Sequence, residues 1–296
     1  MLKRVGLFLL TNFLVILTAG IILAIVFPML GIDPSGLYGL ALLCGIFGMT
    51  GAFISLAISR WMAKRAYNIQ IIKANEQNFQ LREIYEMVAR LSKNAGLPSV
   101  PEVGIYKSQE PNAFATGPSK KKSLIAFSTG LLNSMDKSEV EAVAGHEISH
   151  ISNGDMVTMT LLTGIINALV MFLARIIAGA INNFLKDDSG KGGLGFFAYI
   201  LVVNLLQTFF MFFATIPIAA FSRWREYQAD AGSAKVTSPR AMADALKALA
   251  NGAQVQAKKD SFAIAKISSN RKVSLWATHP SIEDRVARLE KMQYGR

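Results

Sequence analysis

The sequence has few charged residues, few histidines and a single cysteine. Charged residues make up only 17% of its 296 positions and hydrophobic residues 52%, whereas about 25% of an ordinary soluble protein is charged. This balance argues against a soluble fold. Cys44, the single cysteine, can form no internal disulfide, which agrees with a soluble part that faces the reducing cytoplasm. Two of the three histidines stand four residues apart.

The hydrophobic residues are concentrated in four long blocks. Residues 5–27 and 36–59 contain no charged residue, residues 156–185 contain only Arg175, and residues 192–222 again contain none. Each block is longer than the ~20 residues that cross the hydrocarbon core of a bilayer. A buried core helix would explain one such block, but four of them predict a mainly α-helical membrane protein. Arg175 is costly against lipid, so we expect it to face protein or water.

Positive charges at the ends of the first two blocks predict their orientation. Lys3 and Arg4 precede the first block, Arg60 follows the second, and the short loop between them carries only Asp33. Under the positive-inside rule, the N-terminus and the segment after Arg60 then lie in the cytoplasm.

Residues 146–150, with the sequence His-Glu-Ile-Ser-His, form an H-E-x-x-H motif. On a helix, His146 and His150 lie on one face, where two neutral imidazoles provide two sides of a tetrahedral zinc site. Glu147 stands beside the first histidine and can take a proton from a water at the metal. The motif predicts a zinc-dependent hydrolase, most often a peptidase.

Local signals place this motif on a well-formed helix. Asp136 and Glu139 match a capping box at its start, and Asn153 with Gly154 matches its end. Two histidines four apart can also decorate an ordinary helix, but here the motif comes with the helix that metal binding requires. Short strands are expected before it, at residues 102–106, 113–116 and 123–128. They predict a small sheet beside the motif helix, with an edge that can hold an extended peptide over the metal.

A catalytic zinc site needs a third ligand from the protein. The third and fourth apolar blocks predict a hairpin over residues 156–221, with both outer ends on one side of the membrane, so the chain after it can reach the histidines. Glu226 and Asp230 are four residues apart on one helix face. Glu226 can bind zinc, and Asp230 can hold a ligating imidazole. The alternative is that both are surface charges paired with Arg223 or Arg225.

The order of these features closely resembles that of the HtpX-type membrane metalloproteases, which are bacterial heat-shock relatives of the type I CAAX prenyl endopeptidases. The resemblance covers nearly the whole chain. It rests on the two N-terminal blocks, the apolar hairpin and four motifs, which are Asn-Ala-Phe-Ala-Thr-Gly at 112–117, His-Glu-Ile-Ser-His at 146–150, Ser-Arg-Trp-Arg-Glu-Tyr-Gln-Ala-Asp at 222–230 and His-Pro at 279–280. This combination is far more specific than the H-E-x-x-H motif alone.

The resemblance implies roles for several residues. Glu226 becomes the third zinc ligand, and Asp230 supports a zinc-binding histidine. Asn112, Ala113 and Phe114 become part of an element on the substrate side of the cleft.

The third histidine, His279, has two interpretations. The resemblance allows it to donate a hydrogen bond to the oxyanion of the reaction, and the alternative is that it caps a helix that begins at Ser281. Arg285 belongs to the same C-terminal pattern, and we expect it to pair with a nearby carboxylate.

We therefore expect a zincin-like metalloprotease domain beside about four membrane helices. The expected parts are two transmembrane helices in 1–59, a cytoplasmic part with the small sheet and the motif helix in 60–155, an apolar hairpin, spanning or re-entrant, in 156–221, and a cytoplasmic part with the third ligand in 222–296. The last part is rich in Lys and Arg, which attract anionic lipid head groups. It has no interleaved aromatic pattern, so nucleic acid is not an expected partner.

The expected function is a multi-pass zinc endopeptidase of the bacterial inner membrane, with one zinc ion per subunit. By the resemblance it cleaves misfolded or damaged membrane proteins from the cytoplasmic side, in protein quality control and the stress response. The alternatives are a processing peptidase with one defined substrate and a non-catalytic zinc-binding membrane scaffold. The chain has few apolar blocks for the enclosed chamber of the CAAX relatives, and the intact Glu147 counts against a scaffold.

Overall fold

The computed structural model describes residues 2–186, 192–257 and 275–294. The chain forms two compact units, and each unit takes two separate segments of it. The first unit comprises residues 1–55 and 159–218, and the second comprises residues 56–158 and 219–296. Three of the long helices contribute residues to both units.

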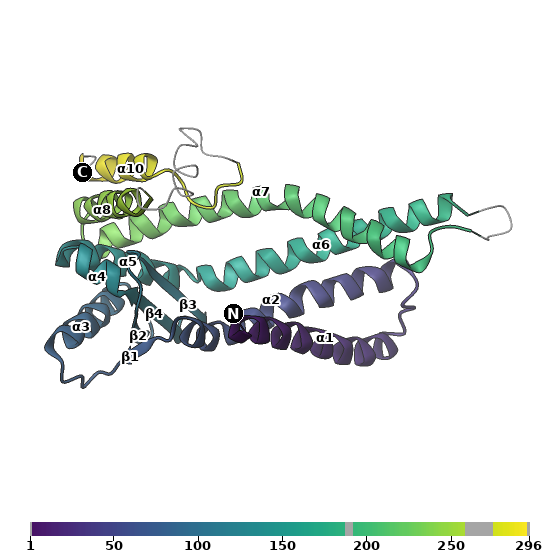
Figure 1. Ribbon diagram of the computed structural model, residues 1–296, viewed down its shortest axis with the longest axis horizontal. Helices are drawn as coiled ribbons and strands as arrows, with labels where there is room; N and C mark the ends of the chain where they lie inside the picture. The colour runs from purple at the N-terminus through teal and green to yellow at the C-terminus, as the bar shows by residue number, and fades with distance from the viewer. Residues whose placement is uncertain (1, 187–191, 258–274, 295–296) are drawn as a thin grey trace. The chain divides into compact units, whose positions relative to one another are not determined.

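The first unit consists of long apolar helices (Figure 1). They are α1 (Leu2–Leu30), the first part of α2 (Leu37–Tyr67), most of α6 (Asp155–Phe184) and the first part of α7 (Phe196–Val236). All four helices are long and apolar enough to cross a membrane, as the composition predicts. Large hydrophobic side chains face outward on them, for example Phe13, Ile16 and Leu201, which are 61%, 63% and 59% exposed. Apolar surface of this extent is typical of a membrane-facing protein.

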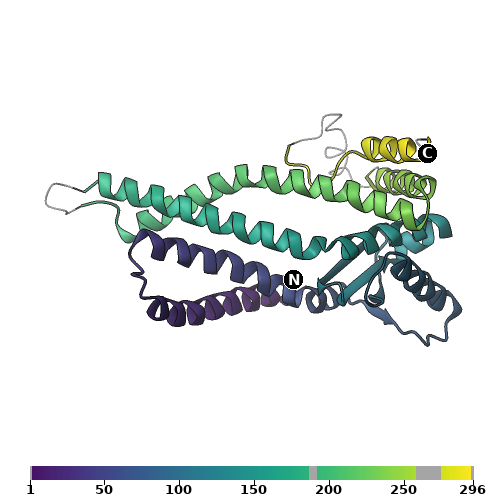
Figure 2. The ribbon, with the colours of Figure 1, turned by 180° about the vertical axis from the view of Figure 1, so that it is seen from behind.

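Small residues allow α2 and α6 to approach each other closely within this unit. A Cβ atom on Gly48 of α2 would lie 2.7 Å from the backbone nitrogen of Ala168, and one on Gly164 of α6 would lie 2.7 Å from the sulfur of Met49. Neither position therefore has room for a side chain. Close contacts through small residues are typical of helices that pack in membranes, and both ribbon views show α2 and α6 adjacent (Figures 1 and 2).

The second unit contains a four-stranded mixed sheet. Its strands are β1 (Gln70–Ile72), β2 (Glu102–Tyr106), β3 (Ala113–Ser119) and β4 (Lys122–Ser128). Their order is β1-β2-β4-β3, with β2 and β4 parallel and the other pairs antiparallel. The prediction of three strands is confirmed, although β3 extends to Ser119. The short edge strand β1 is an addition, because three residues give no periodic signal.

Among the described residues, five further helices belong to this unit. They are α3 (Phe79–Asn94), α4 (Thr129–Ser134), α5 (Lys137–Asn153), α8 (Pro239–Ala257) and α10 (Ile282–Tyr294). Of these, α3, α4 and α5 contact the sheet. Helix α5 is central, because it contacts β3, β4, α3 and α8, while α8 and α10 lie side by side (Figure 1). The fully buried side chains of Phe127, Ile148 and Leu246 belong to one hydrophobic core. This core holds α5, which carries the H-E-x-x-H motif.

Candidate metal centre

Helix α5 is fixed at both of its ends. At its start, Asp136 accepts the backbone N–H of Glu139 at 2.9 Å and the Glu139 carboxylate accepts that of Asp136 at 2.9 Å, which confirms the predicted capping box. At its end, Gly154 has a φ of 75°, a left-handed conformation that glycine adopts without strain. The motif occupies the last turns of this helix, so both histidines project from one face.

Two imidazoles and one carboxylate converge beside α5. The Nε2 atoms of His146 and His150 lie 3.1 Å apart. Glu226 on α7 places one carboxylate oxygen 3.5 Å from His146 Nε2 and the other 3.4 Å from His150 Nε2, and the three residues offer ligand atoms within 4.8 Å of one another. Two imidazole nitrogens and one carboxylate oxygen are a common donor set for catalytic zinc. The residues present therefore fit the metal that the motif predicts.

Each imidazole faces a buried carboxylate on its other side. His146 Nδ1 lies 3.0 Å from Asp230 Oδ1, although the alignment there is not that of a hydrogen bond. His150 Nδ1 forms a hydrogen bond of 2.6 Å with Asp155 Oδ2. Carboxylates on the Nδ1 side leave both Nε2 atoms facing the cluster, which is the orientation that binding through Nε2 requires.

A buried arginine holds the carboxylates of α7. Arg285 on α10 donates from Nε to Asp230 Oδ2 at 2.7 Å and from Nη2 to Asp230 Oδ1 at 2.6 Å. Its Nη1 lies 3.6 Å from Glu226. Glu226 and Asp230 are each only 3% exposed, so the alternative that they are surface charges is wrong. The expected pairing of Arg285 with a carboxylate is confirmed.

The electrostatics of the cluster favour positive charge on the imidazoles. Burial by itself lowers the pKa of His150, but hydrogen bonds with Asp155 and Glu226 outweigh it and raise this pKa to about 9. Burial likewise opposes the protonation of His146, and Asp230 and Glu226 more than compensate, so its pKa is also raised. A buried centre that stabilises positive charge suits a divalent cation.

A cleft of about 400 Å³, here called the metal cleft, opens at this cluster. Glu147, next to His146 on α5, is partly exposed and lines it. Asn112, Ala113 and Phe114, at the beginning of edge strand β3, line it as well. The structure thus brings the expected proton acceptor and the expected substrate-side residues to one cleft.

His279 also lines the metal cleft. Its Nδ1 lies 3.2 Å from an oxygen of Glu226, and its side chain is 65% exposed. The alternative that His279 caps α10 is wrong, because Ser281 Oγ accepts the backbone N–H of Asp284 at 3.0 Å in that position.

Two residues around the cluster are not evident from the sequence. Asp155 stands at the start of a helix, where acidic residues are common because they stabilise the helix dipole, so its position gives no sign of a link to a histidine. Arg223 donates from Nη1 to the backbone oxygens of Leu275 and Ala277, at 3.1 and 2.6 Å. It thereby holds the segment that leads to His279.

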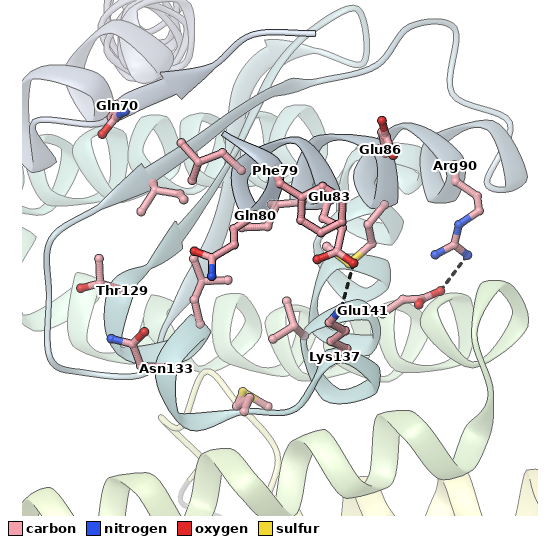
Figure 3. A pocket seen from close by; sticks show the side chains of 17 residues that line it. Gln70, Phe79, Gln80, Glu83, Glu86, Arg90, Thr129, Asn133, Lys137 and Glu141 are labelled. Carbon is pink, nitrogen blue, oxygen red and sulfur yellow. Dashed lines mark hydrogen bonds and ion pairs between the residues drawn. The ribbon is translucent and has the colours of Figure 1, made fainter. Parts of the chain in front are cut away.

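A larger hollow, here called the α3–α5 groove, lies between α3 and the segment formed by α4 and α5 (Figure 3), with a volume of about 1010 Å³. Figure 3 shows two ion pairs across it, from Lys137 to Glu83 and from Arg90 to Glu141, each 2.8 Å long. None of the residues that line the groove belongs to the metal cluster. The remaining acid of its lining, Glu86, lies 3.8 Å from Arg82 on the same helix, so the charges of the groove form separate surface pairs and do not converge on one point.

The sequence resembles one family of known proteins over most of its length. The model of peptidase family M48 matches residues 76–293. Protease HtpX of Aeromonas hydrophila subsp. hydrophila is 46% identical over 290 residues, which cover 97% of this chain and 99% of that protein. Protease HtpX of Shewanella oneidensis is 44% identical over 290 residues, with the same coverage of both chains.

The chain also resembles a solved structure. The crystal structure of S. mikatae Ste24p matches 98% of this chain and 67% of that chain, with a TM-score of 0.62 and 18% sequence identity. At this identity the likeness concerns the fold alone. It agrees with the expected fold of apolar helices joined to a domain with a small sheet.

Proposed function

The chain belongs to peptidase family M48 and is a membrane metalloendopeptidase, and we propose that it uses zinc to cleave misfolded or damaged membrane proteins from the cytoplasmic side of the bacterial inner membrane. The observation that carries this proposal is the convergence of His146, His150 and Glu226 at a cleft that Glu147 also lines. The corresponding cellular role is protein quality control under stress.

The residues of the metal cleft divide the chemistry among them. His146, His150 and Glu226 hold the zinc ion, which when bound supplies a Lewis acid that makes a water in the cleft more acidic. Glu147 accepts the proton of this water as the peptide carbonyl is attacked, and then delivers it to the leaving amine. His279 donates a hydrogen bond to the oxyanion that develops on the carbonyl oxygen.

The substrate binds along the free edge of β3. Within the residues that the structure describes, this strand pairs with β4 on one side only, so an extended peptide can add to its other edge through backbone hydrogen bonds. Asn112, Ala113 and Phe114 line the cleft where this edge begins. A peptide in this position passes the residues that carry the chemistry.

Membrane proteins are the proposed substrates because site residues and apolar stretches share the same helices. Glu226 and Asp230 belong to α7, and Asp155 begins α6, and both helices are apolar enough to cross a membrane. The basic residues after the second apolar block support a cytoplasmic cleft. The basic C-terminal part supports contact with anionic lipid head groups.

Zinc content and cleavage test the activity in detergent-purified wild type and Glu147→Gln. We expect both proteins to contain zinc and only the wild type to cleave casein or itself. Zinc without cleavage by the wild type would favour the scaffold, and cleavage of a single protein from a panel of membrane substrates would favour the processing peptidase. Equal cleavage by both proteins would remove Glu147 from the mechanism.

Cysteine labelling tests the orientation. Cys44 is the single cysteine, so Cys44→Ala provides a cysteine-free background into which Lys121→Cys is introduced, in the exposed turn between β3 and β4. A membrane-impermeant maleimide should label this cysteine in inverted vesicles and not in intact spheroplasts. Labelling in spheroplasts alone would place the cleft on the opposite side of the membrane.

A further inference from the structure

We propose that Asp155 is a positioning residue of the metal centre, which holds His150 in the ring orientation and tautomer that bind metal through Nε2. The inference rests on the zinc site of the proposed function and adds one residue to it. Among the described residues, Asp155 pairs with His150 at Nδ1, the ring nitrogen that faces away from the cluster, and it is not one of the residues that line the metal cleft, so it acts through His150.

The contact between these two residues is short and buried. Asp155 is 5% exposed, and its Oδ2 lies 2.6 Å from His150 Nδ1. Within residues 2–186, 192–257 and 275–294, His150 is the only side chain that pairs with it. A carboxylate removed from water is costly unless it is hydrogen-bonded. The bond to His150 is therefore what compensates for the burial of this acid.

The backbone places Asp155 beside the helix that it follows. Gly154 ends α5 with a φ of 75°, and its carbonyl oxygen accepts the N–H groups of Val157 and Thr158 at 3.1 Å each. Helix α6 therefore begins at Asp155 without an intervening loop. This tight junction, which depends on the left-handed conformation of a glycine, brings the carboxylate back to His150.

The two imidazoles of the centre differ in how they are supported. Asp230, behind His146, is itself held by two hydrogen bonds from Arg285. In the part of the chain that the structure describes, Asp155 has no arginine partner and directs its charge to His150 alone. A carboxylate that accepts the free N–H of a ligating imidazole fixes the tautomer and raises the basicity of the ligand. The tautomer and the basicity of His150 thus both depend on the single contact with Asp155.

The alternative role of Asp155 is structural. An acidic residue in the first turn stabilises a helix through its dipole, and that effect does not need a metal. The two roles have different consequences. A helix-stabilising role changes the unfolding of the metal-free protein, whereas a positioning role changes the affinity for metal.

Zinc affinity is the decisive measurement, in the full-length protein in detergent. Glu147→Gln serves as the parent, since it prevents self-cleavage, and competition with a chromophoric chelator gives the affinity. Asp155→Asn, which preserves size, and Asp155→Ala should weaken zinc binding by about 10–100-fold, and Asp155→Glu should recover part of the loss. The matched control is Asp244→Asn, an acid on α8 that pairs with Arg240 at the surface, which should bind zinc like the parent.

Unchanged affinity in Asp155→Asn and Asp155→Ala overturns the inference, and so does an equal loss in Asp244→Asn. A lower unfolding midpoint of the metal-free variants with unchanged zinc affinity overturns it as well, and assigns the structural role. If Asp155→Ala does not fold, Asp155→Asn decides. Failure of the parent to bind zinc would refute the proposed zinc site itself, whereas a parent that binds zinc beside unaffected variants refutes only the role of Asp155.

Discussion

Two hollows of the second unit, the α3–α5 groove and the metal cleft, differ in character. The α3–α5 groove has a volume of about 1010 Å³, and the metal cleft about 400 Å³. In the groove, opposite charges pair across the rim and stay in contact with solvent. In the pair of Lys137 with Glu83, for example, the Lys137 side chain is 87% exposed. In the metal cleft, His146 and Glu226 are almost completely buried. The volume of a hollow therefore does not identify the functional site here.

The two hollows differ in the free-energy cost of holding their charged side chains where they are. An exposed ion pair contributes about 0–1 kcal/mol, and such pairs form on many surfaces. A buried charge loses its hydration and needs several partners. Glu226 has five of them, which are His146, His150, Arg225, His279 and Arg285. Buried, convergent charges are typical of functional sites, so substitutions in the two hollows should differ in kind as well as in size.

The largest contrast is expected between two glutamates, one in each hollow. Glu226→Gln keeps the size of the side chain but removes the charge that faces both imidazoles, so we expect no stably bound zinc and no detectable cleavage. Glu86→Gln, in the lining of the groove, should retain both. Zinc content after dialysis and casein cleavage check this pair. Normal cleavage by Glu226→Gln would mean that the cluster is not the catalytic centre.

Two arginines of α10, one buried and one exposed, test how burial changes the contribution of a charged side chain to stability. Arg285→Met leaves the buried carboxylate of Asp230 without its bidentate partner, which should cost about 3–5 kcal/mol of unfolding free energy. Arg288→Met removes a guanidinium whose central carbon lies 3.7 Å from the centre of the Tyr227 ring. At an exposed site the loss of this contact should lower the unfolding free energy by about 0.5–1 kcal/mol. Denaturant unfolding in detergent measures both. Equal losses of unfolding free energy in the two variants would show that burial does not determine how much each arginine stabilises the protein.

Helix α5 was predictable because its signals are carried by residues that are neighbours in the sequence. The capping box of Asp136 and Glu139, the H-E-x-x-H spacing and the turn at Gly154 all lie within one short segment, and the structure has each of them. The apolar blocks were predictable for a similar reason, because hydropathy is a property of the segment itself. The family resemblance then brought Glu226 and Asp230 to the same site, across the apolar hairpin.

Contacts that depend on the fold were not predictable in this way. The hydrogen bond between Asp155 and His150 depends on the turn of the chain at Gly154, so the sequence alone does not indicate it. Ser281 and His279 both stand before α10, and only the structure shows that Ser281 is the cap. The α3–α5 groove arises from the packing of helices that are distant in the sequence, and no local pattern marks it.

His279 and Ser281 provide the next test, because they separate chemistry from helix capping at the edge of the metal cleft. His279→Gln should lower kcat by about 10²–10³-fold if it donates to the oxyanion, while zinc content stays unchanged. Ser281→Ala should lower stability by about 1 kcal/mol through the lost cap of α10 and leave kcat nearly unchanged. Kinetics on a peptide substrate together with thermal melts measure both effects. A normal kcat in His279→Gln would exclude the oxyanion role.

The smallest effect is expected at the ion pair between Arg90 and Glu141 in the α3–α5 groove. Both side chains keep contact with solvent, at 53% and 28% exposure, so a double-mutant cycle of Arg90→Met and Glu141→Gln should give a coupling of about 0.2–1 kcal/mol. Cleavage by the double variant should equal that of the wild type, because no residue of the groove belongs to the metal cluster. A fall in cleavage with zinc retained would give the groove a part in substrate binding, and the contrast between the two hollows would then not hold.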